Sequence, residues 1–206
     1  MTSPAPLIHI VDDDASFRIS LGRLLQAAGY RTKLYESGDA FLAKPPAGEP
    51  GCVLLDMQMN GMNGFQLQEH LSRSDNILPV VFLTAHANIP ASVQAMRGGA
   101  EDYLSKPVGN EALFAAVERA LARYAERSER QERLASIRKL VARLTPRETE
   151  VFSLVVRGKP NKQIASELGT SERTIKAHRQ AIMEKLRVNS LAEAVSIAER
   201  LGLLGG

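Results

Sequence analysis

The chain has 206 residues, 26 Lys and Arg against 23 Asp and Glu (net charge +3), and a hydrophobic content of 44% that can supply a core to each of two small domains. No apolar run approaches the ~18 residues of a membrane span, and the N-terminus lacks the basic and apolar stretches of a secretory signal, so we expect a cytoplasmic chain with no membrane contact. The single cysteine, Cys52, excludes a disulfide framework and a cysteine-rich zinc site.

The first 125 residues alternate between short apolar runs and amphipathic stretches. Strands are expected at 7–11, 32–36, 52–56, 79–85 and 102–106, and helices at 14–28, 37–43, 64–73, 90–98 and from 110 onward. Strands that alternate with helices pair in parallel and are covered on both faces. We therefore predict an α/β fold: a doubly wound, flavodoxin-like, five-stranded parallel sheet in the order 2-1-3-4-5.

Residues 110–145 contain no glycine or proline, which predicts one long helix. Its part from 126 to 143 is expected to be a linker that continues the last helix of the first domain. Favourable pairs four residues apart are expected between Glu126 and Arg130 and between Glu129 and Arg133. This stretch is either a solvated linker or a seam that pairs with a second copy of the chain.

The remainder, residues 144–206, is predicted to be an all-α domain of four short helices, with a tight turn between the second and third helices, which span about 161–180. Residues 126–206 carry 16 Lys and Arg against 10 Asp and Glu, whereas residues 1–125 carry 10 against 13. A basic back half suits a polyanionic partner. The expected helix caps are a capping box of Thr145 and Glu148 with Pro146 between them, then Asn161, then Thr170 or Ser171, and a capping box of Ser190 and Glu193.

Polar side chains follow the strands of the predicted sheet where the carboxyl ends of parallel strands meet. They are Asp12, Asp13 and Asp14 after the first strand, Asp56 at the end of the third, Thr84 at the end of the fourth and Lys106 at the end of the fifth. Carboxylates about 4 Å apart repel by roughly 4 kcal/mol per pair at an effective dielectric near 20. A hard cation that prefers oxygen ligands would neutralise these carboxylates, so the pattern predicts a Mg²⁺ site.

Lys106 and Thr84 are hydrogen-bond donors, which a site built only to hold a metal would not need. An ammonium and a hydroxyl suit phosphoryl oxygens. A carboxylate, a Mg²⁺ ion and such donors together indicate phosphoryl transfer to an aspartate. Asp56 is the expected acceptor because its strand is central.

Three segments strongly resemble the receiver domain of two-component response regulators: "VDDD" (11–14), "LLDMQMNGMNG" (54–64) and "VVFLTAHANIPASVQAMRGGAEDYLSKP" (80–107). The resemblance covers about residues 5–125, within an expected receiver domain of residues 1–125. It implies that Asp56 is the phospho-acceptor, and that Mg²⁺ is bound by Asp13, Asp56 and the Gln58 carbonyl, with Asp12 acting through water. It also implies that Thr84 and Tyr103 form a switch pair and that Lys106 contacts the phosphoryl group.

Two residues near these motifs stand apart. Asp14 lies one position past the acidic pair and is expected to be only a helix N-cap. Asn60 occupies a position where the receiver family usually has proline, which removes no ligand but is expected to loosen the loop beside Asp56.

The segment "LTPRETEVFSLVVRGKPNKQIASELGTSERTIKAHRQAIMEKLRVNSLAEAV" (144–195) resembles the LuxR-type helix-turn-helix. At 100° per residue, Ile175, Ile182 and Leu186 share a face that should pack inward, and Arg173 lies on the opposite face. The third helix should enter the major groove, with Lys176, Ala177 and Gln180 against base edges. Phosphate contacts are expected from Lys162, Thr174, Arg179 and Lys185.

Together the two resemblances indicate a response regulator of the NarL/FixJ type. This implies a histidine kinase partner, a double-stranded DNA operator, a homodimer after phosphorylation, contact with RNA polymerase, and no enzymatic role. Two alternatives remain open for the front half. "VDDDAS" (11–16) resembles the start of haloacid-dehalogenase-type phosphatases, although Ser16 stands where they have threonine. A quorum-type ligand sensor would share only the tail and would leave the acidic residues unexplained.

Overall fold

The computed structural model describes residues 5–44, 46, 48–74, 76–85 and 88–204. Its contacts divide the chain into two compact units, Met1–Ser128 and Glu129–Gly206. In the ranges that are described, no helix combines the length and apolarity needed to cross a membrane.

The first unit is built on a five-stranded sheet in which every neighbouring pair is parallel. The strand order β2-β1-β3-β4-β5 confirms the predicted one. Every residue of β3 is buried, as expected for the central strand of a sheet that is covered on both faces. The strands are β1 (Leu7–Val11), β2 (Arg31–Tyr35), β3 (Gly51–Asp56), β4 (Val80–Thr84) and β5 (Asp102–Ser105).

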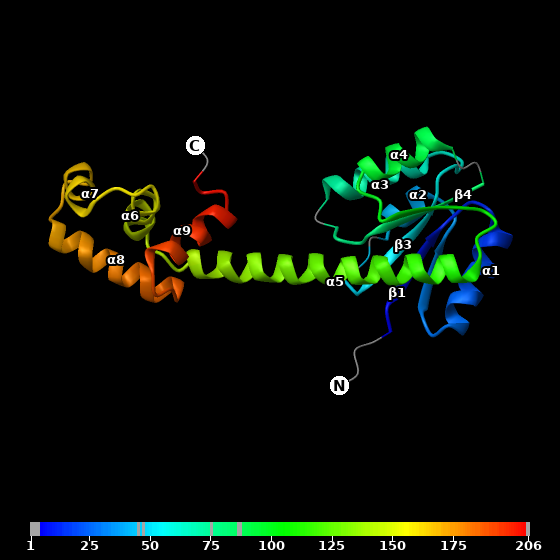
Figure 1. Cartoon of the computed structure of the whole chain (residues 1–206), viewed down its shortest axis with the longest axis horizontal. Coiled ribbons are helices and arrows are strands. Elements are labelled where there is room, and N and C mark those ends of the chain that lie inside the picture. The colour runs from blue at the N-terminus through cyan, green and yellow to red at the C-terminus, as the bar shows by residue number, and fades with distance from the viewer. Residues whose placement is uncertain (1–4, 45, 47, 75, 86–87, 205–206) are drawn as a thin grey trace. The chain divides into compact units, whose positions relative to one another are not determined.

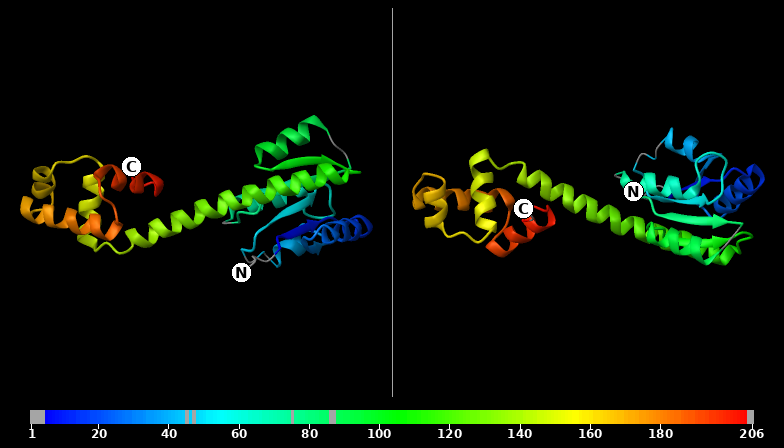
Figure 2. Two further views of the ribbon diagram at one scale, coloured as in Figure 1. Left: turned by 60° about the horizontal axis from the view of Figure 1, so that its bottom comes forward. Right: turned by 90° about the horizontal axis from the view of Figure 1, so that it is seen from above.

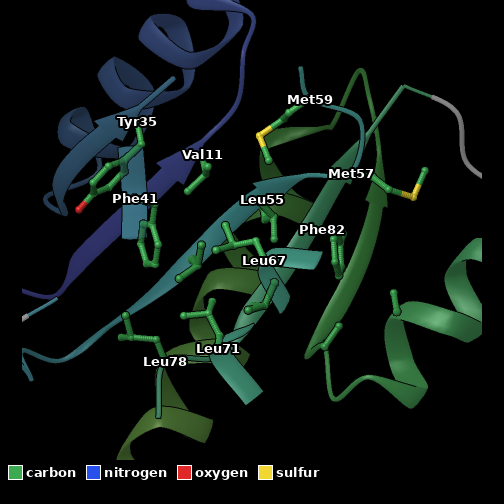
Figure 3. Packing of buried hydrophobic residues seen from close by; sticks show 14 of the residues in the cluster. Val11, Tyr35, Phe41, Leu55, Met57, Met59, Leu67, Leu71, Leu78 and Phe82 are labelled. Atoms are coloured by element: carbon green, nitrogen blue, oxygen red, sulfur yellow. The ribbon is translucent and has the colours of Figure 1, made fainter. Parts of the chain in front are cut away.

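Helices cover both faces of this sheet (Figures 1 and 2). On one face, Leu54 of β3 belongs to a core cluster with Leu25 of α1 (Ala15–Ala27) and Val117 of α5 (Asn110–Val141). Its neighbour Leu55 lies in the cluster of the other face, because successive strand side chains point to opposite sides. Figure 3 shows this second cluster, in which Leu55 and Phe82 pack near Leu67 of α3. That face is covered by α2 (Gly38–Leu42), α3 (Gly64–Arg73) and α4 (Ile89–Arg97).

The helix α5 runs for 32 residues without a break and belongs to both units. Leu113 and Val117 near its start are buried in the first unit, whereas Ile137 near its end is buried in the core of the second. The expected pair between Glu129 and Arg133 is present at 2.5 Å. Glu126 instead pairs with Arg123, at 3.0 Å, so the expected pair with Arg130 is wrong. A partner three residues back lies within the same reach on a helix surface.

In its described part, up to residue 204, the second unit contains four further helices around one apolar core, which includes Val151, Ile164, Ile175, Ile182 and Leu186. The inward face predicted for the third of these helices is confirmed, because Ile175, Ile182 and Leu186 are all buried. The helices are α6 (Pro146–Val156), α7 (Asn161–Glu167), α8 (Glu172–Leu186) and α9 (Leu191–Arg200).

The predicted caps are confirmed for α6 and α8 and in part for α9. Thr145 and Glu148 form the capping box of α6, and Ser171 caps α8. Ser190 caps α9, but the Glu193 side chain accepts from the amide of Asn189 and the hydroxyl of Ser190, and not from the Ser190 amide that would close the box.

The predicted cap of α7 is wrong. Pro160 occupies the N-cap position without a side-chain hydrogen bond, and Asn161 is already helical. The Asn161 side chain instead accepts a hydrogen bond from Arg179 of α8, at 3.1 Å. A contact between two helices has replaced a local cap.

Candidate functional site

The predicted strand-end residues of the first unit come together at one rim of the sheet. One carboxylate oxygen from each of Asp12, Asp13 and Asp56 lies within 4.8 Å of the others. The Lys106 Nζ atom lies 2.6 Å from Asp12 Oδ2 and 3.2 Å from Asp56 Oδ2. Asp14, as expected, is outside the cluster and caps α1 through the amides of Ser16 and Phe17.

The loop after Asp56 turns back over the rim because α3 begins very close to the end of β3. A Cβ atom on Gly64 would lie 2.5 Å from the Asp56 carbonyl oxygen and 2.8 Å from the Phe82 ring, so only glycine fits. Asn63 and Gln66 then close a capping box at the start of α3. The Asn- and Gly-rich sequence after Asp56 therefore makes a tight return that leaves the carboxylate at the rim.

The three carboxylates differ in environment. Asp12 is buried, Asp56 is 8% exposed, and Asp13 is exposed. Burial raises the pKa of Asp56; Lys106 opposes this shift and Asp12 reinforces it. Two carboxylates 4.8 Å apart repel by about 3 kcal/mol at an effective dielectric near 20. One ammonium against three carboxylates leaves an excess of negative charge that a divalent cation would neutralise.

Lys106 is held in place from several directions. Its amide donates to the carbonyl oxygen of Thr84 at 2.7 Å, which fixes its backbone to the end of β4. Its Nζ atom lies 4.2 Å from the centre of the Phe17 ring, within cation–π range. No pattern in the sequence indicates that Phe17 contacts Lys106, since only the packing of α1 beside the rim brings the ring there.

The other two predicted residues of the rim occupy different depths. Thr84 is fully buried at the end of β4. Tyr103 is half-buried on β5, its ring 6.3 Å from that of Phe82, and its hydroxyl lies 3.8 Å from Met57 Sδ. The Tyr103 hydroxyl therefore rests on the loop that follows Asp56.

In the second unit, α8 exposes a row of the predicted residues. Arg173, Thr174, Lys176, Ala177 and Gln180 are all exposed, as is Lys162 on α7. Arg179 is half-buried and holds Asn161, as described above.

Lys185 differs from this row. Its Nζ atom contacts both carboxylate oxygens of Glu148 on α6, at 2.5 and 2.7 Å. Glu148 is buried, and its contact with Lys185 lowers its pKa. The Lys185 ammonium thus joins two helices of the unit, a role that its place in the sequence did not reveal.

Comparison with known proteins agrees with both halves of this description. Residues 8–118 match the response regulator receiver domain, and residues 142–198 match the LuxR family of bacterial regulatory proteins. The chain therefore belongs to the response regulators that join a receiver domain to a LuxR-type DNA-binding domain, the two-component transcriptional regulators of the FixJ type. The receiver match favours this reading over the phosphatase and ligand-sensor alternatives.

Individual relatives extend over nearly the whole chain. Nodulation protein W of Bradyrhizobium diazoefficiens is 37% identical over 98% of this chain and 88% of its own length. The transcriptional regulatory protein FixJ of the same organism is 39% identical over 96% of both chains. Among solved structures, the response regulator StyR matches with a TM-score of 0.76 and 43% identity over 95% of this chain and 99% of its own. Full-length FixJ from B. japonicum matches with a TM-score of 0.58 and 36% identity, over 99% and 100%.

Proposed function

We propose that Asp56 accepts a phosphoryl group from a histidine kinase in the cytoplasm and that this event controls DNA binding by α8. The observation that carries the proposal is the position of the Lys106 Nζ atom, which touches both Asp12 and Asp56 beside the third carboxylate. From this position, the Lys106 ammonium needs only a small movement to contact a phosphoryl oxygen on Asp56.

The residues of the rim fit Mg²⁺, because they offer only oxygen ligands and an excess of negative charge. Asp13, Asp56 and the Gln58 carbonyl would hold the ion directly, with Asp12 acting through water. When bound, Mg²⁺ would neutralise the charge that builds on the transferring phosphoryl oxygens.

In the transfer, a carboxylate oxygen of Asp56 forms a bond to phosphorus while the bond from phosphorus to the kinase histidine breaks. Lys106 then pairs with the new phosphoryl group as a point charge, and the Thr84 hydroxyl donates to it. Tyr103 leaves its contact with Met57 and turns inward as Thr84 moves. Phosphorylation must favour the active conformation over the inactive one by a few kcal/mol for this shift to act as a switch.

We propose that this change alters the surface formed by α4 and β5, and that a second copy of the chain binds there. Ile89, Val93 and Met96 project from α4 and are 79%, 44% and 50% exposed. Their spacing of four and three residues places them on one face of the helix. A two-fold pairing through this face would bring two copies of α8 to paired half-sites.

On DNA, we propose that Lys176, Ala177 and Gln180 meet base edges in the major groove. Lys162, Arg173, Thr174 and Arg179 are assigned to phosphates, which fix the register without reading sequence. Lys185 is left out of this surface because Glu148 already holds it. The bound dimer would act on transcription by contact with RNA polymerase, as a regulator rather than an enzyme.

The test is DNA selection from a random library, with and without the phosphoryl mimic beryllofluoride and Mg²⁺. The wild-type chain should enrich a two-part sequence, and the mimic should raise its affinity. Asp56→Asn should bind the same sequence without any response to beryllofluoride or to acetyl phosphate. An Asp56→Asn chain that still responds would refute Asp56 as the acceptor.

A further inference from the structure

We propose that Asn60 is a positioning residue for the divalent cation, and that it acts by holding the exposed carboxylate of Asp13 in the orientation that binds the metal. The inference rests on the metal site proposed above and adds to it a residue outside the ligand set. Asn60 lies in the loop between β3 and α3, 47 residues from Asp13 in the sequence.

The two more buried carboxylates of the rim are each fixed by contacts of their own. Asp12 accepts from Lys106 Nζ at 2.6 Å and from the amide of Asp14 at 2.9 Å. Asp56 contacts Lys106 Nζ at 3.2 Å and accepts from the amide of Gln58 at 3.4 Å. Neither set of contacts reaches Asp13.

Asp13 is the exposed member of the three, and its carboxylate is bound by Asn60. The backbone amide of Asn60 donates to Asp13 Oδ2 at 3.2 Å, and the side-chain Nδ2 donates to the same oxygen at 3.0 Å. Both donors meet one oxygen, so the other oxygen, Oδ1, stays available to a cation. An exposed aspartate without these bonds would spread over several rotamers.

The chemistry of the two donors explains why asparagine matters at this position. The backbone donor is available to any residue except proline, whereas the side-chain donor requires an amide that reaches Oδ2. Carboxylates that bind metals are commonly fixed by an outer hydrogen bond, and loss of such a bond weakens metal binding by about 10- to 100-fold. The Asn60 amide supplies that bond here and orients the ligand before the metal arrives.

The experiment is a Mg²⁺ titration of the ¹⁵N-labelled full chain, followed through the backbone amide signals of the rim. Asn60→Ala removes only the side-chain donor and should weaken Mg²⁺ binding about tenfold. Asn189→Ala, at an exposed asparagine in the second unit, is the matched control and should bind Mg²⁺ as the wild type does. The Asn60 side-chain amide signals should stay in their hydrogen-bonded position when the wild type is saturated with Mg²⁺.

A double variant separates a positioning role from a general loosening of the loop. In an Asp13→Asn background, titrated to saturation, Asn60→Ala should have little further effect on Mg²⁺ affinity. Equal weakening in both backgrounds, an unchanged affinity, or tighter binding by Asn60→Ala would each overturn the inference. If the wild type shows no Mg²⁺ binding that depends on Asp13, the proposed metal site itself fails, and the role of Asn60 fails with it.

Discussion

Replacing Gly64 with alanine tests how the loop after Asp56 is built. Gly64 is the first residue of α3, and its backbone lies against the end of β3. An added Cβ atom would lie 2.5 Å from the Asp56 carbonyl oxygen and 2.9 Å from the Met57 Cα atom. Both neighbours are backbone atoms, so neither can swing aside as a flexible side chain would.

The size of the effect follows from these distances. Ordinary contacts begin at 3.4 Å, so the Asp56 carbonyl must move by about 0.9 Å or α3 must shift by a similar amount. Overpacking of this kind lowers the free energy of unfolding by about 1–3 kcal/mol. For a unit of this size we expect a melting temperature lower by about 4–12 °C. The same shift displaces Asp56, so phosphorylation by acetyl phosphate should slow.

The assay is thermal unfolding of the full chain, with Gly109→Ala as the matched control. Gly109 is in the same unit, and a Cβ atom there would meet nothing within 4 Å. Its substitution should change the free energy of unfolding by about half a kcal/mol at most. If Gly64→Ala has the same melting temperature as Gly109→Ala and takes up phosphate at the wild-type rate, the close approach of Gly64 to the end of β3 is incorrect.

Three further predictions concern other parts of the chain. Burial lowers the pKa of His9 to about 4, so the contribution of neutral His9 to stability is present above pH 6.5 and is lost as the pH falls toward 4. The free energy of unfolding should therefore fall by about 3 kcal/mol across that range because of His9. In a pH series of denaturant titrations, His9→Gln should lose this fall. Lys162→Ala should lower the slope of DNA affinity against salt concentration by about one counterion. Lys185→Ala should leave that slope unchanged and lower the melting temperature of the second unit, because Lys185 pairs with Glu148. Equal slopes for both variants would contradict the assignment of Lys162 to a phosphate and of Lys185 to Glu148. Ile89→Asp on α4 should keep the chain monomeric in beryllofluoride and Mg²⁺ by analytical ultracentrifugation, and a dimer of wild-type strength would exclude that face.

The sequence by itself determined the architecture of the first unit and the membership of its rim. Alternating strand and helix patterns predict a parallel sheet, and in such a sheet the strand ends that carry Asp12, Asp56, Thr84 and Lys106 must share one edge. The helix starts at Thr145, Ser171 and Ser190 could also be predicted from the sequence, because an N-cap side chain accepts from amides only two or three residues away. These signals are local or follow from topology alone.

Only the tertiary structure decided which side chains meet across the fold. Asn60 binds Asp13 over 47 residues, and Lys185 binds Glu148 over 37. Asn161 was expected to cap its own helix, yet it holds Arg179 of the next one. Such pairings depend on helix packing angles and on loop paths that differ by a few Å, and no periodic pattern in the chain encodes either. The residue types that line the rim are therefore written in the sequence, but the contacts that orient each carboxylate are set by packing.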